Sequence, residues 1–470
     1  MYNKEKDLAK NTLILTIGKI STQAITFFLL PLYTAYLSRE DYGIVDLIST
    51  IVFLLFPILN MQIEQAIFRY MVVNRNNNFK LKTIISSAFS FSFVQIAVFA
   101  VLFTLLQSFV NNEYKWFLLI NLIPATLNFS LMQVLRGFGD NIGYSISAFI
   151  SSFVNIGINL LLILVFNCGA DAMLIASAIG NLVSVLFILI RTKFWNYYNP
   201  KFARRDELKE LLSYSIPLIP NELSWWAIRT SDRFVITAAL GTAANGILAI
   251  AHKFPNIFVM IYNILGLAWT ESVVMHLKEA DGERYFSDMT NRIFRIFSCL
   301  GLLIVAVLPF CFRYLVNDNF NQAYYLIPLY MIGSVFNVVI GVISTVYIAN
   351  KQTKVIAKTS IIAALVCLLT NIILAKYIDI YSSPVSNIFG FGIMMIYRCI
   401  DIKRYTTVKW DRRFIIVLTI FTIINLLTYY IQITSLCLLS LIITCGFVLY
   451  TNRSDLGIVI QFCRKNLIKA

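Results

Sequence analysis

The 470-residue chain is too apolar for a protein surrounded by water: hydrophobic residues make up 59% of it and charged residues only 13%, and its mean hydropathy is +0.75. A soluble domain carries roughly 25% charged and about 45–50% apolar residues, so this composition could not cover a water-facing surface. We therefore predict an all-α polytopic membrane protein, whose net charge of +15 has to be explained within that class.

Runs of about 20 apolar residues, the length that crosses the hydrocarbon core, recur along the whole chain and predict about 14 transmembrane helices. The first run, 11–36, is too long for a cleavable signal peptide and lacks its cleavage pattern, so we expect it to remain as the first helix. The predicted spans begin near Asn11, Gly43, Leu81, Tyr114, Ile142, Ala172, Leu211, Asn245, Asn291, Ala323, Val355, Ile380, Arg412 and Ser435.

The distribution of lysine and arginine predicts the orientation, because these residues gather on the cytoplasmic side of membrane helices. With the N-terminus inside and fourteen crossings, 31 of the 39 basic residues fall at inner ends and only four at outer ends, namely Arg39, Lys115, Arg313 and Lys376. We expect both termini to be cytoplasmic. The positive charge is thus mainly a topology signal, and it requires no nucleic-acid partner.

The first six spans and the next six show an internal repeat, as in many transporters. At an offset of 203 residues, Gly43 meets Gly246 and Leu37 meets Leu240, and at 212 Asn159 meets Asn371. We predict two pseudo-symmetric six-helix bundles around a central cavity. The expected domains are an N-terminal bundle over 1–195, a cytoplasmic linker over 196–210, a C-terminal bundle over 211–405, and two further helices with a tail over 406–470.

The seventh span carries charges that are costly inside a bilayer. Glu222, Arg229, Asp232 and Arg233 are spaced so that all four lie toward one face of a helix. A charge at the bilayer centre costs roughly 2.5–3.5 kcal/mol on insertion scales, so this face should look into the protein or a wet cavity. Either it binds a ligand, or it is an ion network that locks helices together, with Asp232 neutralising Arg229 or Arg233.

Further charges fall on the spans that the repeat makes equivalent: Lys19 and Glu64 in the first half, Lys253 and Glu271 in the second. Guanidinium groups match phosphate oxygens bidentately, so a cavity lined by Lys19, Arg229, Arg233 and Lys253 would suit a phosphate. The acidic residues Glu64, Glu222, Asp232 and Glu271 form a candidate coupling or charge network, because desolvation can raise a carboxyl pKa enough for proton exchange.

The sequence contains no motif that is typical of an enzyme or of a metal site. Its longest stretch without an apolar run, 191–210, is too short for an extramembrane catalytic domain, and we predict no catalytic residues. Two histidines and eight scattered cysteines form no CxxC or HExxH motif. We therefore expect no metal site and no cofactor.

Several segments resemble one family of membrane proteins. They are KNTLILTIGKI with FFLLPLYTAYLSREDYGIVDLI near the N-terminus, LRGFGDNIGY at 135–144, IPLIPNELSWWAIRTSDRFVI at 216–236, NGILAIAHKFPNIF at 245–258, and AWTES at 268–272. In this order they are similar to the polysaccharide or O-antigen flippases (Wzx-like) of the multidrug/oligosaccharidyl-lipid/polysaccharide (MOP) exporter superfamily. The resemblance covers about residues 8–358.

This resemblance implies a flippase that moves undecaprenyl-pyrophosphate-linked oligosaccharide, such as an O-antigen or capsule repeat unit, across the bacterial inner membrane by alternating access. Arg229, Asp232 and Arg233 match the SDR segment of the family's seventh span, whose cations are thought to line the lumen. Implied partners are the lipid-linked oligosaccharide, membrane lipids and a glycan polymerase with other assembly proteins. The DIYSSPVSNIFGFG segment of the second half departs from the family pattern.

Two other functions remain open at this point. A multidrug exporter of the same superfamily would favour carboxylates and aromatic rings for cationic drugs, against which the cations inside the spans argue. A non-transporting scaffold of glycan assembly would bind the lipid-linked sugar without translocating it.

Overall fold

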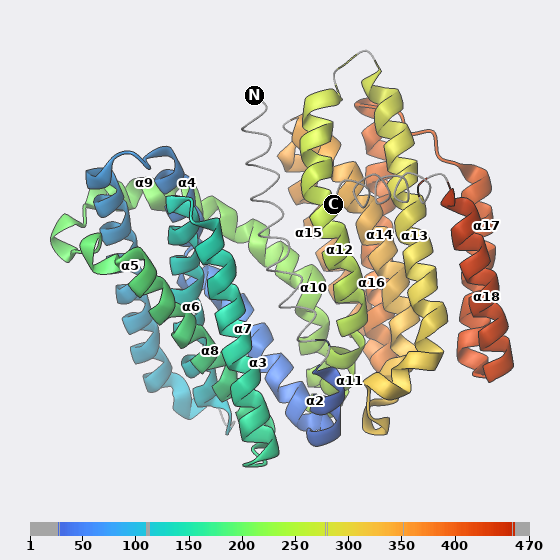
Figure 1. Cartoon of the computed structure of the whole chain (residues 1–470), viewed down its shortest axis with the longest axis horizontal. Helices are drawn as coiled ribbons and strands as arrows, with labels where there is room; N and C mark the ends of the chain where they lie inside the picture. The colour runs from blue at the N-terminus through green and yellow to red at the C-terminus, as the bar shows by residue number, and fades with distance from the viewer. Residues whose placement is uncertain are drawn as a thin grey trace, which may run out of the picture. The chain divides into compact units, whose positions relative to one another are not determined.

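The computed structural model describes residues 27, 29–109, 113–277, 279, 281–350, 352–453 and 455. All regular secondary structure in this part of the chain is helical (Figure 1), which confirms the predicted all-α class. Of the first expected span, the structure describes the end, where α2 (Leu30–Tyr36) begins.

The described residues form two compact units. The first comprises residues up to 237 together with 241–246, and the second comprises 238–240 and the residues from 247 on. The sequence-based domain boundaries at 195, 210 and 405 concern the internal repeat and stay predictions.

The first unit is built from antiparallel helices of which α6, α7 and α8 pack side by side, with α4 against α6 (Figure 1). Its core is an apolar cluster that includes Ile67, Ile84 and Leu135, each with an exposed fraction of 0%. Its longer helices are α3 (Arg39–Leu59), α4 (Ile63–Val73), α5 (Asn78–Leu106), α6 (Lys115–Phe138), α7 (Asn141–Leu164), α8 (Gly169–Thr192), α9 (Arg205–Ser215) and most of α10 (Ile219–Leu240).

Polar caps fix where several of these helices begin. Ser38 and Asp41 form a reciprocal capping box at the start of α3. The Asp140 side chain accepts a hydrogen bond of 2.8 Å from the Gly143 amide at the start of α7. Gly139, between α6 and α7, has φ of 86°, a conformation that glycine adopts without steric cost. These local signals place the turns between spans.

The second unit contains α12 (Lys253–His276), α13 (Gly282–Leu315), α14 (Gln322–Ala349), α15 (Thr353–Ile378), α16 (Ser382–Asp401), α17 (Arg412–Ile431) and α18 (Thr434–Thr451). The apolar stretch 354–404 is 51 residues long, far more than the roughly 20 that one crossing needs. It folds back at Asp379–Tyr381, so that α15 and α16 pack against each other.

By length and composition, the described part of the chain contains 10 segments that could cross a membrane, or 11 when the bent pair of α11 (Thr242–Ala251) and 253–266 is counted. The stretch 354–404 enters this number as one segment although it forms two helices. The charged α10 is not among the segments. The protein is therefore a multi-pass membrane protein, and these numbers are compatible with the fourteen expected spans.

Most helices begin within four residues of the predicted starts. The seventh span was predicted from Leu211, which lies in α9, whereas the helix that carries its charges, α10, begins at Ile219. The largest difference is at α13. It begins at Gly282, whereas the apolar run that marks its span begins near Asn291. The extra turns, GERYFSDMT, are polar. A search for apolar runs detects only the part of a helix that crosses the bilayer, so it does not predict these turns.

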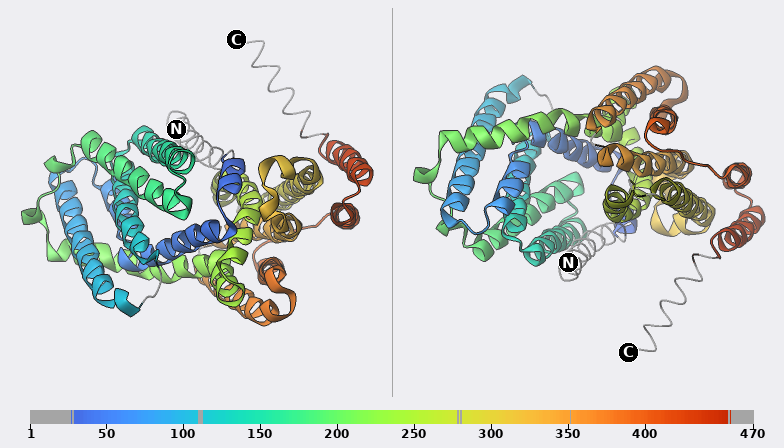
Figure 2. Two further views of the ribbon diagram at one scale, coloured as in Figure 1. Left: turned by 90° about the horizontal axis from the view of Figure 1, so that it is seen from below. Right: turned by 90° about the horizontal axis from the view of Figure 1, so that it is seen from above.

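The last two helices pack on α13 at one side of the second unit (Figure 2). Phe447 of α18 stacks on Phe421 of α17 with 4.2 Å between ring centroids, and both belong to a cluster with Leu302 and Cys299 of α13. The hairpin is thus held to the second unit by aromatic and aliphatic packing.

The glycines matched by the internal repeat lie at a close crossing within the first unit. Gly43 is on α3, and Gly246 is on the first half of α11. A Cβ atom on Gly43 would overlap the Thr242 carbonyl oxygen, and one on Gly246 would overlap the Arg39 carbonyl oxygen. The Asn245 side chain also donates to the Gly43 carbonyl at 2.9 Å. Only glycine allows the two backbones this approach.

Candidate functional site

The charged face predicted for the seventh span lies on α10. A short 3-10 turn leads into this helix, and Pro217 and Pro220 lie in the first turns of the two elements. Proline is tolerated there, since the N–H group that it lacks would have no partner within the helix. The indole of Trp226 donates to the Thr50 carbonyl oxygen at 3.1 Å. This bond ties α10 to α3 within the first unit.

Arg233 is held in a buried ion pair with Asp46 of α3. Its Nε lies 2.5 Å from Asp46 Oδ2, and only 9% of the Arg233 side chain is exposed. Its Nη1 also donates to the Arg229 carbonyl oxygen at 3.2 Å and lies 3.7 Å from Asp232 Oδ1. Asp46 in turn lies 3.4 Å from the Asn245 amide nitrogen. This cation is neutralised, and it connects α10, α3 and α11.

Arg229, one turn before Arg233, is in a different environment. Its residue is exposed, and its guanidinium carbon lies 5.0 Å from the centre of the Trp225 ring, a cation–π distance. In the described part of the chain it forms no ion pair. An exposed guanidinium on a stacking platform is available to an anionic ligand.

The two acidic residues of this helix also differ. Asp232 is buried, with 2% of the residue exposed, and its Oδ1 accepts from the Arg233 amide at 3.0 Å. Glu222 lies in the first turn of α10 and is exposed. The sequence predicted four charges on one face of the helix. In the structure Asp232 and Arg233 are buried, whereas Glu222 and Arg229 are exposed.

Glu64 forms a polar cluster inside the first unit. It is 3% exposed and accepts a hydrogen bond of 2.7 Å from the Asn60 side chain. The Asn60 amide also bonds Ser130 at 3.1 Å, and Ser92 donates to Asn60 Oδ1 at 3.1 Å. Helices α4, α5 and α6 thus meet at this carboxyl through neutral hydrogen-bonding groups.

Three further candidate residues lie elsewhere. Lys19 is outside the described residues. Lys253 begins α12 in the second unit and is half-buried. Glu271 lies on α12, and its side chain is outside what the structure describes. Among the described residues, no group of three or more His, Cys, Asp and Glu side chains could hold a metal ion.

Arg398 of α16 is an intramembrane cation that the sequence did not reveal, because it stands at the end of an apolar run among the basic residues expected on the inner side. It is 0% exposed. Its guanidinium donates to Thr359 Oγ1 at 2.7 Å and to the Ile356 carbonyl at 3.1 Å. Helical spacing from the buried Asn387 and Met394 would have placed it on the interior face, since these positions are separated by whole turns.

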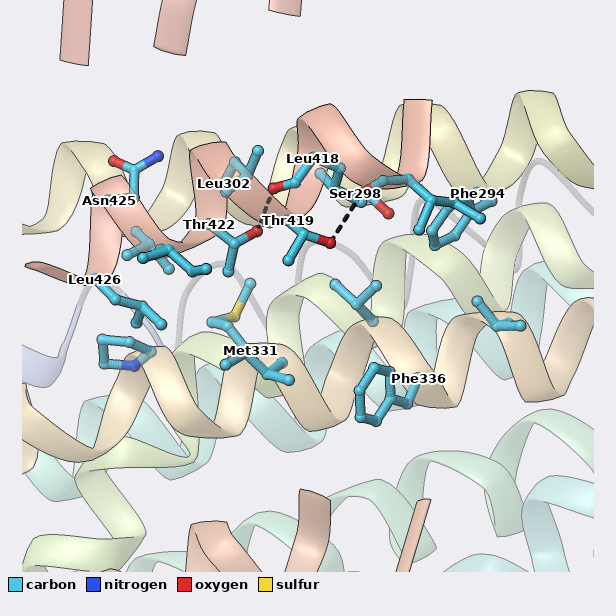
Figure 3. A pocket seen from close by; sticks show the side chains of 18 of the residues that line it. Phe294, Ser298, Leu302, Met331, Phe336, Leu418, Thr419, Thr422, Asn425 and Leu426 are labelled. Carbon is cyan, nitrogen blue, oxygen red and sulfur yellow. Dashed lines mark hydrogen bonds between the residues drawn. The ribbon is translucent and has the colours of Figure 1, made fainter. Parts of the chain in front are cut away.

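The second unit also holds an apolar cavity of about 590 Å³ between α13, α14, α16 and α17. Figure 3 shows Leu302, Met331 and Leu418 at this cavity, where the Thr422 hydroxyl donates back to the Leu418 carbonyl at 2.8 Å. Because such hydroxyls are bonded to their own helix, the cavity offers mainly hydrocarbon to a ligand. It therefore differs in chemistry from the charged face of α10.

The fold has close structural relatives among membrane transporters. "Lipid II flippase MurJ, inward closed conformation" matches with a TM-score of 0.69 and 15% identity, covering 93% of this chain and 99% of that one. An inward-facing multidrug resistance MATE family transporter of the MOP superfamily matches with a TM-score of 0.67 and 13% identity, covering 83% and 98%. At these identities the likeness establishes the fold.

Fold and composition together define a polytopic helical membrane protein with the fold of these transporters. The family model described as "Polysaccharide biosynthesis protein" matches residues 8–270, more than half of the chain, and the protein belongs to this family. No curated protein sequence matches it significantly.

Proposed function

We propose that the protein moves an undecaprenyl-pyrophosphate-linked oligosaccharide from the cytoplasmic to the outer leaflet of the bacterial inner membrane by alternating access. Family membership supports a role in polysaccharide biosynthesis, and the fold supports transport. The observation that carries the substrate assignment is the exposed, stacked guanidinium of Arg229 on a helix too charged to face lipid.

The two arginines of α10 have separate roles in this proposal. Arg229 binds the pyrophosphate, since its donors are accessible and guanidinium groups bind phosphate oxygens in pairs. Arg233 is engaged by Asp46 and positions α10 against α3. Lys19 and Lys253 are further proposed ligands of the anion, and Glu64, Glu222, Asp232 and Glu271 are the proposed coupling or charge network.

The remaining parts of the substrate follow their own chemistry. The sugars travel in a polar cavity, and the polyprenyl tail stays in the lipid, where its hydrocarbon needs no desolvation. No covalent step is involved, so the protein acts as a transporter and not as an enzyme, with both termini in the cytoplasm. A glycan polymerase and other assembly proteins are its proposed partners.

The test is leaflet translocation of a labelled undecaprenyl-pyrophosphate oligosaccharide in proteoliposomes, with the native chain and the Arg229→Ala and Arg229→Lys variants. Losing a bidentate charge-assisted contact of about 1.5–3 kcal/mol should slow transport at limiting substrate roughly 10- to 100-fold. Arg229→Lys should recover only part of it, because an ammonium cannot bind two oxygens in a fork. Lys209→Gln, an exposed loss of charge on α9, is the matched control.

Undiminished transport by Arg229→Ala, reconstituted at the native amount, would remove this residue from the substrate site. Binding of the oligosaccharide without translocation by the native chain would favour the scaffold function instead.

A multidrug exporter is the second candidate, favoured by the structural match to a multidrug resistance MATE transporter. It predicts gradient-driven accumulation of a cationic dye in the same proteoliposomes. Dye transport without oligosaccharide transport would select this function.

A further inference from the structure

A basic pocket lies at one end of the first unit, where α5 begins and α8 ends. It has a volume of about 310 Å³, within the lower range of small-ligand sites. Its lining residues are Asn78, Lys82, Arg191, Thr192, Lys193, Asn196 and Tyr197. Three of these are cationic, the others offer amide or hydroxyl groups, and none of the seven is acidic.

The three cations of the pocket differ in whether they form an ion pair. Arg191 bonds Asp140 at the start of α7, with Nε–Oδ2 2.5 Å and Nη2–Oδ1 3.1 Å. Lys82 and Lys193 form no ion pair within the described residues. The acidic residues Glu207 and Glu210 of α9 lie 2.7 and 3.9 Å from Lys80, which does not line the pocket. The pocket therefore keeps an excess of positive charge.

The backbone at Lys193 is a second, independent feature. This residue ends α8 in the left-handed conformation, with φ of 48° and ψ of 50°, a position where glycine is the common residue. A side chain there costs about 1 kcal/mol or more. The Lys193 side chain therefore leaves the chain at a tight turn on the rim of the basic pocket.

The surroundings place this pocket at a membrane surface. Asn78 is the first residue of one candidate span and Thr192 the last of another, so the pocket lies at the level of the lipid headgroups. Trp195 and Phe79 beside it are 62% and 51% exposed, as expected of aromatic residues that rest in the interface. The excess of lysine and arginine assigns this end to the cytoplasmic side.

We propose that this pocket binds the phosphate group of an anionic phospholipid, such as phosphatidylglycerol, from the inner leaflet. The lysine ammonium groups of residues 82 and 193 neutralise the phosphodiester, and the side chains of Asn78, Asn196 and Tyr197 donate to its oxygens. Basic pockets between transmembrane helices on the cytoplasmic side are suited to such headgroups. The proposal is independent of the transported substrate.

The experiment measures thermal unfolding of the full-length protein in a neutral detergent, with phosphatidylglycerol or phosphatidylcholine added. A lipid that binds only the folded state raises the unfolding midpoint, and we expect a rise of about 2–5 °C with phosphatidylglycerol alone. The pocket variant is Lys82→Gln with Lys193→Gly, in which glycine also relieves the left-handed backbone and so protects folding. The control is Lys201→Gln with Lys209→Gln, which removes equal charge from exposed positions outside the pocket.

The proposal is supported when native protein and control are stabilised and the pocket variant is not. It is overturned when the pocket variant gains as much as the native chain, or when the control loses the effect as well, since general charge attraction would then suffice. Glycerol 3-phosphate at the same concentration is the soluble arm. An equal rise with it would assign the pocket to a free phosphate and exclude the lipid.

Discussion

Two arginines four residues apart on α10 illustrate how position decides the role of a side chain. Arg233 meets Asp46 and is buried, whereas Arg229 meets the Trp225 ring and stays exposed. A buried cation without its partner is strongly unfavourable, while an exposed one keeps its hydration. We therefore expect the two residues to affect different properties of the protein, stability for Arg233 and substrate binding for Arg229.

The first prediction concerns the Asp46–Arg233 pair. Asp46→Asn should lower the free energy of unfolding by about 1.5–3 kcal/mol, because it removes the nearer carboxylate from the buried guanidinium of Arg233 and leaves Asp232 at 3.7 Å. Arg233→Met should cost a similar amount, and the double variant should cost clearly less than the sum. The measurement is a double-mutant cycle from denaturation in detergent.

Arg229→Met provides the control for this cycle, and it should change stability by well under 1 kcal/mol. Additive costs in the Asp46 and Arg233 variants would show that the ion pair contributes no coupling.

At the scale of helices, close crossings and end-to-end ion pairs hold the first unit together. The α3–α11 crossing depends on Gly43 and Gly246, and the α7–α8 hairpin depends on Asp140 and Arg191. The first is a steric contact and does not depend on pH. The second is electrostatic, so it responds to protonation.

The second prediction tests the crossing. Gly43→Val should reduce the yield of folded protein sharply, because its side chain would overlap the backbone of α11. Gly157→Ala on α7 is the matched control: a Cβ there meets nothing within 4 Å, and alanine favours helix by about 1 kcal/mol over glycine. Size-exclusion profiles of both variants in detergent give the comparison. A monodisperse Gly43→Val protein of native stability would refute the steric argument.

The third prediction concerns pH. The Arg191 guanidinium, together with the Gly143 amide, lowers the pKa of Asp140 below its ordinary value. A carboxyl group whose pKa is lowered by folding stabilises the protein above its unfolded pKa, about 3.9, and this contribution is lost as the pH falls through the folded value. Asp140→Asn should therefore unfold at a lower temperature than the native chain at pH 7, and the gap should close toward pH 3.

Arg191→Gln should show the same narrowing of the gap, because it removes the other half of the pair. A gap that stays constant from pH 7 to pH 3 would assign the effect of Asp140→Asn to its helix cap instead of the ion pair.

At the scale of the whole molecule, the chain adds a helical hairpin to the second of its two units. Helices α17 and α18 contact α13 through Phe447 and Phe421, and the apolar cavity lies between α13, α14, α16 and α17. In lipid there is little hydrophobic force between helices, so packing of complementary side chains has to hold this hairpin in place.

The fourth prediction tests that packing. Phe447→Ala should lower the free energy of unfolding by about 3 kcal/mol, because it removes a ring that is 9% exposed and stacked on Phe421. Leu449→Ala is the control, since Leu449 is 59% exposed and packs on little within the protein. Thermal unfolding in detergent measures both. Equal effects of the two substitutions would mean that the hairpin is not held by this cluster.

The sequence by itself determined the class of the protein and the approximate start of most of the described helices. This was possible because the length of an apolar run and the residues that cap a helix act locally. The repeat also pointed to Gly43 and Gly246, and the structure brings these two glycines together. The sequence also showed that the charges inside the seventh span have to face the protein interior or a wet cavity. The free energy of placing a charge in lipid is high whatever its partner, so this prediction needed no tertiary structure.

Only the tertiary structure decided which of these charges are paired. Asp46 and Arg233 are 187 residues apart, and the helical period of α10 places Arg229 and Arg233 on nearly the same face, so nothing local distinguishes them. By sequence Arg398 counted as a cytoplasmic charge, yet it is buried on α16 and hydrogen-bonded to α15. Pairing and burial depend on where other helices lie, and that is fixed by the packing of the whole unit.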